Sequence, residues 1–120
     1  EEADIVGCGG WGIGDKKTWH YLEQIAEKLG GAVACTRPPV DEGWAAGEHL
    51  MIGTSGKSVR PKIYLGFGIS GATHHVCGMK DAGLIISVNK DENAEIFKVS
   101  DYGIVGDVKK ILPLLAEAVK

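Results

Sequence analysis

Residues 62–75 read KIYLGFGISGATHH, an apolar stretch that runs directly into a glycine-rich turn. Its first eight residues, KIYLGFGI, are rich in β-branched and aromatic side chains and predict a strand. The segment Ala72–Met79 then predicts a short helix. Three glycines between them have G-x-G-x-x-G spacing, which in a strand–turn–helix unit is typical of dinucleotide binding: Gly66, Gly68 and Gly71. The alternative is a tight turn with small residues for packing, and spacing alone leaves both open.

The same alternation of apolar runs and helical patterns extends along the chain. Further strands are expected at 4–8, 32–36, 83–89 and 96–100, and amphipathic helices at 17–29 and 107–119. Buried strands that alternate with helices predict an α/β fold, namely a three-layer, Rossmann-like parallel sheet with helices on both faces. In such a fold the loops that follow the strands gather at one edge, where ligands bind.

Capping and breaking residues refine the helix boundaries. Asp15 or Thr18 is expected to cap the helix at 17–29, and the Gly30–Gly31 pair to end it. Pro113 predicts a kink in the last helix or a later start for it.

A long segment, 37–61, separates the second and third expected strands. Arg37 precedes two prolines, so we expect no helix there. Long loops in compact domains usually serve a function. Within this loop, GTSGKSVRP (Gly53–Pro61) resembles a phosphate loop but lacks the G-x-x-x-x-G-K-[ST] form, which excludes a nucleoside triphosphatase. The Ser55 hydroxyl could still donate to a ligand.

Composition narrows the class of protein. The chain has 120 residues, of which 44% are hydrophobic, and a net charge of −3. This length suits a single domain, 1–120. The charge argues against a general nucleic-acid binder, and no apolar run approaches the roughly 20 residues of a membrane span. Three separated cysteines without a C-x-x-C favour a reduced, cytoplasm-like compartment. Because the sequence begins without Met, we expect a fragment of a longer protein.

Four more features could carry chemistry. Adjacent helical histidines, His74 and His75, point about 100° apart, and no third ligand stands at metal spacing, so no metal site is expected. One of the pair could instead face a ligand. Arg37 follows a strand and suits an anionic group, although a surface arginine is equally compatible. The NKD segment at 89–91 stands where a ribose-binding residue is expected. Trp11 could cover a planar ligand or pack on the sheet edge.

Several of these stretches together resemble one family. The matching text includes TRPPVDEGW (36–44), GISGA with the following His75 and GMK, VNKD (88–91) and DYGIVGD (101–107). In order and spacing they resemble the C-terminal FAD-binding domain of the electron-transferring flavoprotein alpha subunit, over nearly the whole chain. The resemblance implies a DHS-like NAD/FAD-binding fold and FAD, not a nicotinamide, as cofactor.

The resemblance also implies positions for individual residues. Thr36 and Arg37 would lie against the flavin ring, and His75 would reach the ring near O2. Thr54 and Ser55 would approach N5 and C4=O, and Asn89 and Asp107 the adenosine side. Ser70, with Gly71 and Ala72, would lie beside the ribityl-phosphate part. The other implied contacts are Gly53, Thr73 and Val108. The family position of His74 varies, and no role is assigned to it.

Three positions depart from the family pattern. Trp11 stands where the family commonly has an arginine, so a phosphate or adenine contact there is not carried over. The pair Pro38–Pro39 replaces small residues and would stiffen the loop. Ser55 stands where a threonine is usual and keeps the hydroxyl.

The function implied by the resemblance is electron transfer through a bound flavin with a stabilised semiquinone, between dehydrogenases and a downstream acceptor. Such a domain is an electron carrier rather than a substrate-converting enzyme. Arg37 and His75 would favour the anionic semiquinone. Implied partners are the beta subunit, as a heterodimer, and an N-terminal alpha domain. The implied location is the prokaryotic cytoplasm or the mitochondrial matrix.

Two other functions stay open on the residues alone. One is a non-redox module that binds FAD or another nucleotide as a scaffold. The other is an NAD(P)-binding domain, which rests only on the glycines of 66–71.

Overall fold

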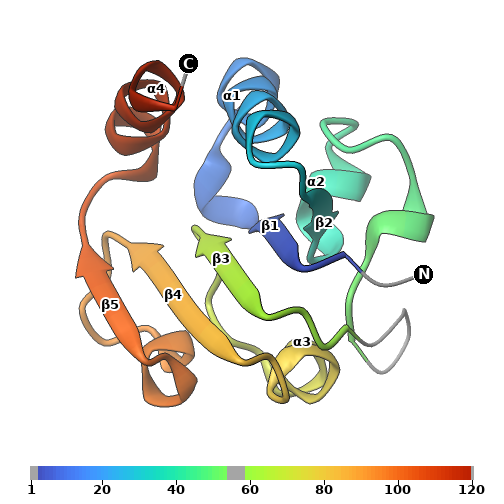
Figure 1. Cartoon of the computed structure of the whole chain (residues 1–120), viewed down its shortest axis with the longest axis vertical. Helices are drawn as coiled ribbons and strands as arrows, with labels where there is room; N and C mark the ends of the chain where they lie inside the picture. Colours follow the sequence, from blue (N-terminus) through green and yellow to red (C-terminus); the bar gives the residue numbers. More distant parts are fainter. Residues whose placement is uncertain (1–2, 54–58, 120) are drawn as a thin grey trace.

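A parallel sheet forms the centre of the computed structural model, which describes residues 3–53 and 59–119 (Figure 1). Its strands have the order β2-β1-β3-β4-β5, and every neighbouring pair is parallel. Their bounds are β1 Ile5–Gly9, β2 Ala32–Cys35, β3 Ile63–Phe67, β4 Leu84–Asn89 and β5 Tyr102–Val105. The first four lie within or one residue beyond the segments that apolar runs predict.

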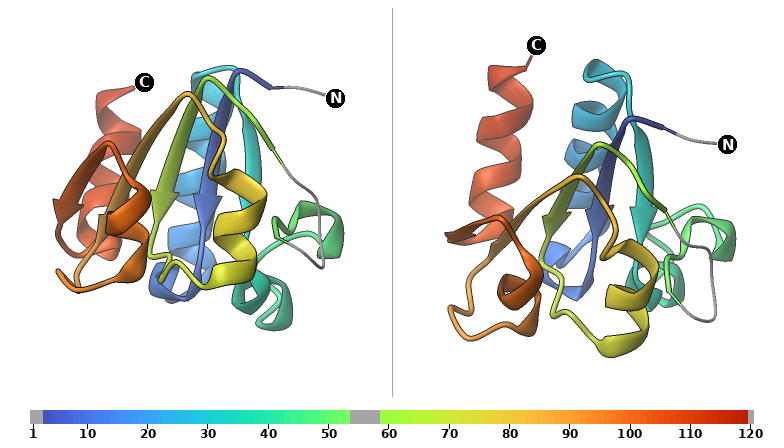
Figure 2. Two further views of the ribbon diagram at one scale, coloured as in Figure 1. Left: turned by 90° about the horizontal axis from the view of Figure 1, so that it is seen from below. Right: turned by 60° about the horizontal axis from the view of Figure 1, so that its bottom comes forward.

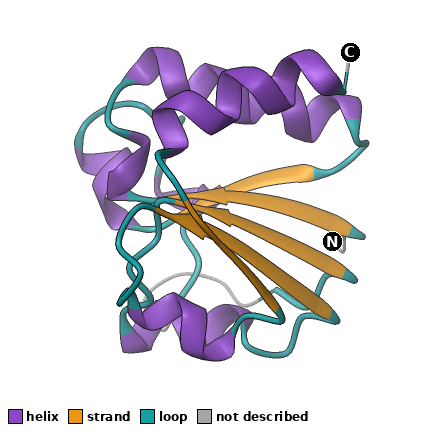
Figure 3. Ribbon diagram, turned by 90° about the vertical axis from the view of Figure 1, so that its left-hand side faces the viewer, coloured by secondary structure: helices purple, strands orange, loops and turns teal. Residues whose placement is uncertain are grey.

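Helices cover both faces of this sheet (Figure 3). On one face lie α1 (Lys16–Lys28) and α4 (Val108–Ala118), and on the other lie α3 (Thr73–Met79) and the 3-10 helix η3 (Glu95–Val99). Three short helices lie in the loops: η1 (Trp11–Ile13), α2 (Arg37–Asp41) and η2 (Glu48–Leu50). This arrangement confirms the predicted three-layer α/β fold.

Each face of the sheet has its own apolar core. Under α1 and α4, the buried Trp19, Leu22 and Leu112 pack with Phe67 of β3. On the opposite face, Tyr64 of β3 packs with other buried side chains, among them Ile52, Met79 and Ile96. Because side chains alternate along a strand, β3 contributes to both cores, as its near-continuous apolar sequence requires.

The expected strand at 96–100 is wrong. These residues fall mostly in η3, and the fifth strand is β5, which follows it. The backbone N–H of Ile96 donates to the carbonyl of Ser70, in the loop after β3, over 3.0 Å. Bound in this way, the segment closes i→i+3 bonds, such as Phe97 N–H to Ala94 O at 3.1 Å, instead of joining the sheet. The side chain of Phe97 then lies against Gly103 of β5.

The expectation that prolines exclude a helix at Arg37 is also wrong. Helix α2 begins at Arg37, with Thr36 as its N-cap and prolines in its first turn. The first N–H groups of a helix have no intrahelical acceptor, so proline sacrifices no bond there. Pro113, by contrast, lies inside α4, which nevertheless begins at Val108 and continues past it. The alternative of a later helix start is therefore wrong.

Both long helices begin at an aspartate. Asp15 Oδ1 accepts from the Thr18 N–H over 2.8 Å, and Asp107 Oδ1 accepts from the Lys109 N–H over 3.0 Å. Of the two expected caps for α1, Asp15 is the one that acts. A salt bridge of 3.5 Å between Lys109 and Asp15 links the starts of α1 and α4. At its other end α1 terminates before Gly30, whose φ of +70° suits glycine.

Replacing Asp15 with alanine is expected to lower the free energy of unfolding by about 1 kcal/mol at neutral pH. Hydrogen bonds from Thr18, followed by the charge of Lys109, lower the pKa of Asp15 below its ordinary 3.8. The cap therefore stabilises the fold above that value, and its contribution is lost as the pH falls through the lowered pKa. Urea unfolding at neutral and acidic pH measures the difference.

The matched control is Asp15→Asn, which caps a helix equally well but does not titrate. It should retain the neutral-pH stability and remove this part of the acid sensitivity. A stability difference between the wild type and Asp15→Ala that stays constant down to the most acidic pH would contradict the argument.

Candidate functional site

A cleft of about 890 Å³ opens at the carboxyl edge of the sheet. The strands all point toward this edge, so the loops that follow them converge there (Figure 2). Its walls come from the loops after β1, β2, β3 and β4 and from the start of α4. The volume lies within the range of small-molecule sites. The sequence expectation that post-strand loops gather at one edge is confirmed.

Two glycines bring the loops after β1 and β3 into backbone contact. Gly12 N–H donates to the carbonyl of Gly68 over 3.0 Å. Gly68 has a φ of +69°, and a Cβ on it would lie 2.6 Å from Gly12 Cα. Only glycine at both positions permits so close an approach. Both glycines line the cleft, so its surface here is bare backbone.

Gly71 makes a similar contact with η3. Its φ is +94°, and an added Cβ would meet the backbone N of Ile96 and lie 2.7 Å from Ile96 Cα. Gly71 is buried behind the cleft rather than lining it. Together with the bond from Ile96 N–H to Ser70 O, it fixes the distance between the loop after β3 and the segment after β4.

Asn89 ties the end of β4 to the loop after β3. Its Nδ2 donates to the carbonyl of Ile69 over 2.9 Å, and its Oδ1 accepts from the Asp91 N–H over 2.9 Å. Asp91 Oδ1 accepts in turn from the Asn93 N–H at 2.9 Å. These bonds hold a wall of the cleft that includes Asn89, Asp91 and Asn93.

Thr36 and Arg37 form the wall at the β2 end. Arg37 is the first residue of α2, and it is exposed two positions after the last residue of β2. Its Nη1 lies 3.7 Å from the sulfur of Met51, and both Thr36 and Arg37 line the cleft. The structure therefore brings this arginine to the predicted ligand edge.

His75 lines the cleft from α3 but is only 1% exposed. Its Nε2 lies 2.7 Å from the Tyr64 hydroxyl and 4.0 Å from the sulfur of Cys8, and its Nδ1 lies 3.4 Å from the carbonyl of Ile52. Burial raises the pKa of both Tyr64 and Cys8, so both stay protonated at neutral pH. The ring nitrogens of His75 thus face protein groups, and its contact with the flavin stays a prediction.

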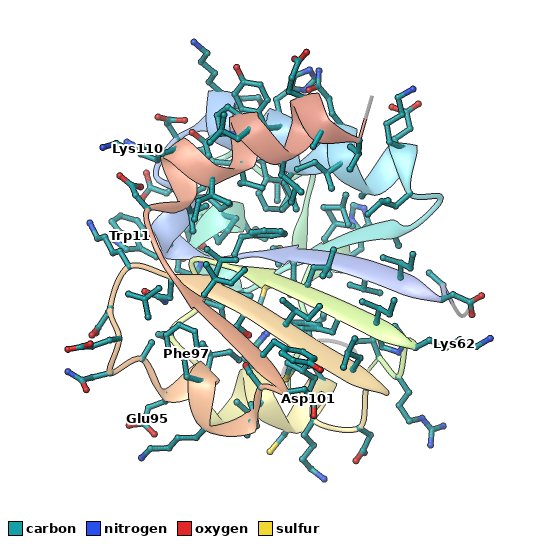
Figure 4. All side chains as sticks on the ribbon, turned by 60° about the vertical axis from the view of Figure 1, so that its left-hand side comes forward. Trp11, Lys62, Glu95, Phe97, Asp101 and Lys110 are labelled. Atoms are coloured by element: carbon teal, nitrogen blue, oxygen red, sulfur yellow. The ribbon has the colours of Figure 1, made fainter. Side chains whose placement is uncertain are left out.

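Trp11, the first residue of η1, lines the cleft. Its side chain, labelled in Figure 4, is 63% exposed. Its ring stacks on that of Trp44, with centroids 6.1 Å apart and planes at 27°. Trp11 therefore packs on Trp44 of a neighbouring loop and also lines the cleft, and its contact with a planar ligand stays a prediction.

Most of the expected site residues meet in this one cleft. Those that line it are Thr36, Arg37, Ser70, Ala72, His75, Asn89, Asp107 and Val108. Gly53 and Gly71 are buried and do not line it. Thr54 and Ser55 lie outside the described residues, as do the side chains of Thr73 and His74. Individual contacts with FAD remain predictions for all of them.

Sequence reasoning assigned no role to several other lining residues. They are Gly12, Gly14, Asn93, Ala94, Glu95 and Lys109, whereas Gly68 belongs to the predicted glycine motif, Lys90 and Asp91 to the NKD segment, and Pro38 to the loop expected to be stiff. Most follow a strand within a few positions, so they could have been predicted from the expectation that ligands bind where the loops after the strands gather. Lys109 also follows a strand, four residues after the end of β5, but the fifth strand was expected at 96–100 and its end was therefore misplaced.

Comparison with known proteins identifies the family. Residues 1–80 match the electron transfer flavoprotein FAD-binding domain. The electron transfer flavoprotein subunit alpha of Thermoanaerobacterium thermosaccharolyticum is 48% identical over the whole chain and 36% of its own length. Protein FixB of Clostridium saccharobutylicum is 51% identical over 98% of the chain and 35% of its own length. The mitochondrial alpha subunit of Arabidopsis thaliana is 45% identical over 96% of the chain and 31% of its own length.

Solved structures agree on the fold. A Sir2 homologue mutant in complex with ADP-ribose superimposes with a TM-score of 0.62 at 14% identity, covering 98% of this chain and 92% of that one. At this identity the likeness concerns the fold alone. Within residues 3–53 and 59–119, no helix is both long and apolar enough to cross a membrane. The chain spans about a third of the length of the curated relatives it matches, and it belongs to the electron transfer flavoprotein FAD-binding domain family.

Proposed function

We propose that this domain holds FAD in the cleft at the carboxyl edge of the sheet and serves as an electron carrier. The observation that carries the proposal is the glycine-built floor of a cleft of about 890 Å³, in a chain whose family is defined by FAD binding. When bound, FAD takes up and releases electrons itself, so the protein has only to hold it and adjust its potential.

The residues present fit such a cofactor. Gly12, Gly14 and Gly68 line the cleft, so at these positions a ligand can approach the backbone without a side chain between them. Arg37 offers a permanent cation at the β2 end, where negative charge on a reduced ring would be stabilised. At the other end of the cleft, Asn89 and Asp107 border the place that the resemblance gives to the adenosine.

The remainder of the flavoprotein is also part of the proposal. We infer that a beta subunit and further alpha-subunit sequence complete the protein, with dehydrogenases as electron donors. Three residues of the edge strand β5 expose large side chains: Tyr102, Ile104 and Val105. Such an edge is usually covered by a partner. Bacterial and mitochondrial relatives support a prokaryotic cytoplasm or a mitochondrial matrix as the location.

The experiment is an anaerobic redox titration of the chain after incubation with FAD and removal of unbound flavin. We expect stoichiometric flavin absorbance that bleaches with dithionite and returns on oxidation. Retained flavin that is neither reduced nor reoxidised would favour a non-redox scaffold. Retention of NAD(P) in place of FAD would favour an NAD(P)-binding domain.

The Arg37→Ala variant should lower the flavin midpoint potential by about 30–60 mV, because the lost cation stabilises reduced FAD more than oxidised FAD. Arg37→Lys keeps the charge and should recover most of this shift. Equal potentials in the wild type and Arg37→Ala would remove Arg37 from the site.

A further inference from the structure

Two buried polar side chains, Tyr64 and Cys8, lie behind the cleft, and neither is among the residues expected to touch FAD. Tyr64 of β3 and Cys8 of β1 are both 0% exposed, and both approach His75 Nε2, at 2.7 and 4.0 Å. His75 alone of the three lines the cleft. Polar groups inside an apolar core are retained at a cost in stability, so their arrangement calls for an explanation.

The hydrogen-bond partners of His75 decide which of its two ring nitrogens carries the hydrogen. The carbonyl of Ile52 can only accept, so the nitrogen that faces it, Nδ1, carries the hydrogen. In the neutral imidazole His75 Nε2 is then an acceptor, and the Tyr64 hydroxyl is its donor over 2.7 Å. Burial keeps the Tyr64 hydroxyl protonated and so able to donate.

We infer that Tyr64 is a positioning residue, which donates to Nε2 and holds the His75 ring in the cleft wall, while the Ile52 carbonyl keeps the proton on Nδ1. Through that ring Tyr64 influences how strongly the cleft prefers reduced over oxidised FAD, a consequence that rests on the proposed function. A short bond from a buried phenol fixes the orientation of an imidazole ring whose tautomer a carbonyl sets, much as hydrogen-bond partners orient metal-bound histidines.

The first test needs no cofactor. In the chain labelled with ¹⁵N, the His75 Nε2 resonance should lie at the position of an unprotonated, hydrogen-bonded nitrogen, with Nδ1 protonated. In Tyr64→Phe, which keeps the ring and its packing, the Nε2 resonance should move to the position of an unprotonated nitrogen without a hydrogen bond, while Nδ1, which still faces the Ile52 carbonyl, stays protonated. A protonated Nε2 in the wild type, or an unchanged spectrum in the variant, would overturn the inference.

The second test is a double-mutant cycle on the FAD-loaded chain. Tyr64→Phe should change the ratio of the affinities for oxidised and reduced FAD by about three- to tenfold, the range of one hydrogen bond. The same substitution in a His75→Ala background should change it by less than twofold. Equal changes in both backgrounds would show that Tyr64 does not act through His75.

The matched control is Tyr21→Phe, which removes a hydroxyl from α1 on the opposite face of the sheet. It should alter neither the His75 resonances nor the affinity ratio. If the wild-type chain retains no FAD, the proposed function fails, while the nitrogen resonances still decide the role of Tyr64.

Discussion

Gly71→Ala is expected to lower the free energy of unfolding by about 2–5 kcal/mol and to remove measurable FAD binding. Part of the loss is the strain of a side chain at a φ of +94°, roughly 1–2 kcal/mol. The larger part is steric, because the new methyl group would meet the backbone N of Ile96 and lie 2.7 Å from its Cα. Backbone cannot rotate out of the way as a side chain can.

Binding should fail along with stability, because the displaced segment is part of the cleft. Moving η3 away from the loop after β3 separates two walls, represented by Ser70 and Glu95. Urea unfolding and flavin retention after gel filtration measure the two effects on the same sample.

Gly30→Ala provides the control for the strain alone. Gly30 has a comparable φ of +70°, but an added Cβ would meet nothing within 4 Å. This variant should lose only about 1–2 kcal/mol and bind FAD as the wild type does. Equal losses in the two variants would show that backbone strain, and not the contact with η3, explains the effect at Gly71.

The packing of η3 on the loop after β3 also explains why the sequence did not predict the fifth strand. Apolar runs predicted four strands because burial on both faces leaves a strong signal in consecutive residues. The fifth was misplaced because Ile96 and Phe97 are as apolar as a strand, and their state depends on the carbonyl of Ser70 in a distant loop. The true edge strand, β5, has all four residues exposed, so burial imposes no pattern on it.

The residues of the site were best predicted from their position at or just after the end of a strand. Thr36, Arg37 and Asn89 each end a strand or follow one directly, and all three line the cleft. What local patterns could not predict is the inward orientation of His75, because its partners come from β1, β3 and the loop at Ile52. Nor could they predict the stacking of Trp11 on Trp44, which joins two loops.

Asn89→Asp is expected to weaken FAD binding by tenfold or more, the second large effect. The substitution keeps the size of the side chain but puts a carboxylate oxygen where Nδ2 now donates to the Ile69 carbonyl over 2.9 Å. Two acceptors at that distance repel each other, and a lost bond to a buried acceptor typically costs about 1–3 kcal/mol. The end of β4 and the loop after β3 should then separate.

An added negative charge would by itself disfavour an anionic cofactor, so the control must carry the same charge. Asn93→Asp does so, because Asn93 lines the same cleft while its described bond is made by its backbone N–H. Fluorescence titration with FAD, repeated at high salt, separates the two contributions, since salt screens the exposed charge but does not restore a missing donor. Asn93→Asp should therefore recover its affinity in salt, whereas Asn89→Asp should not. If the two variants weaken binding equally and both recover, charge alone acts at this wall, and the Asn89–Ile69 bond has no part in shaping the cleft.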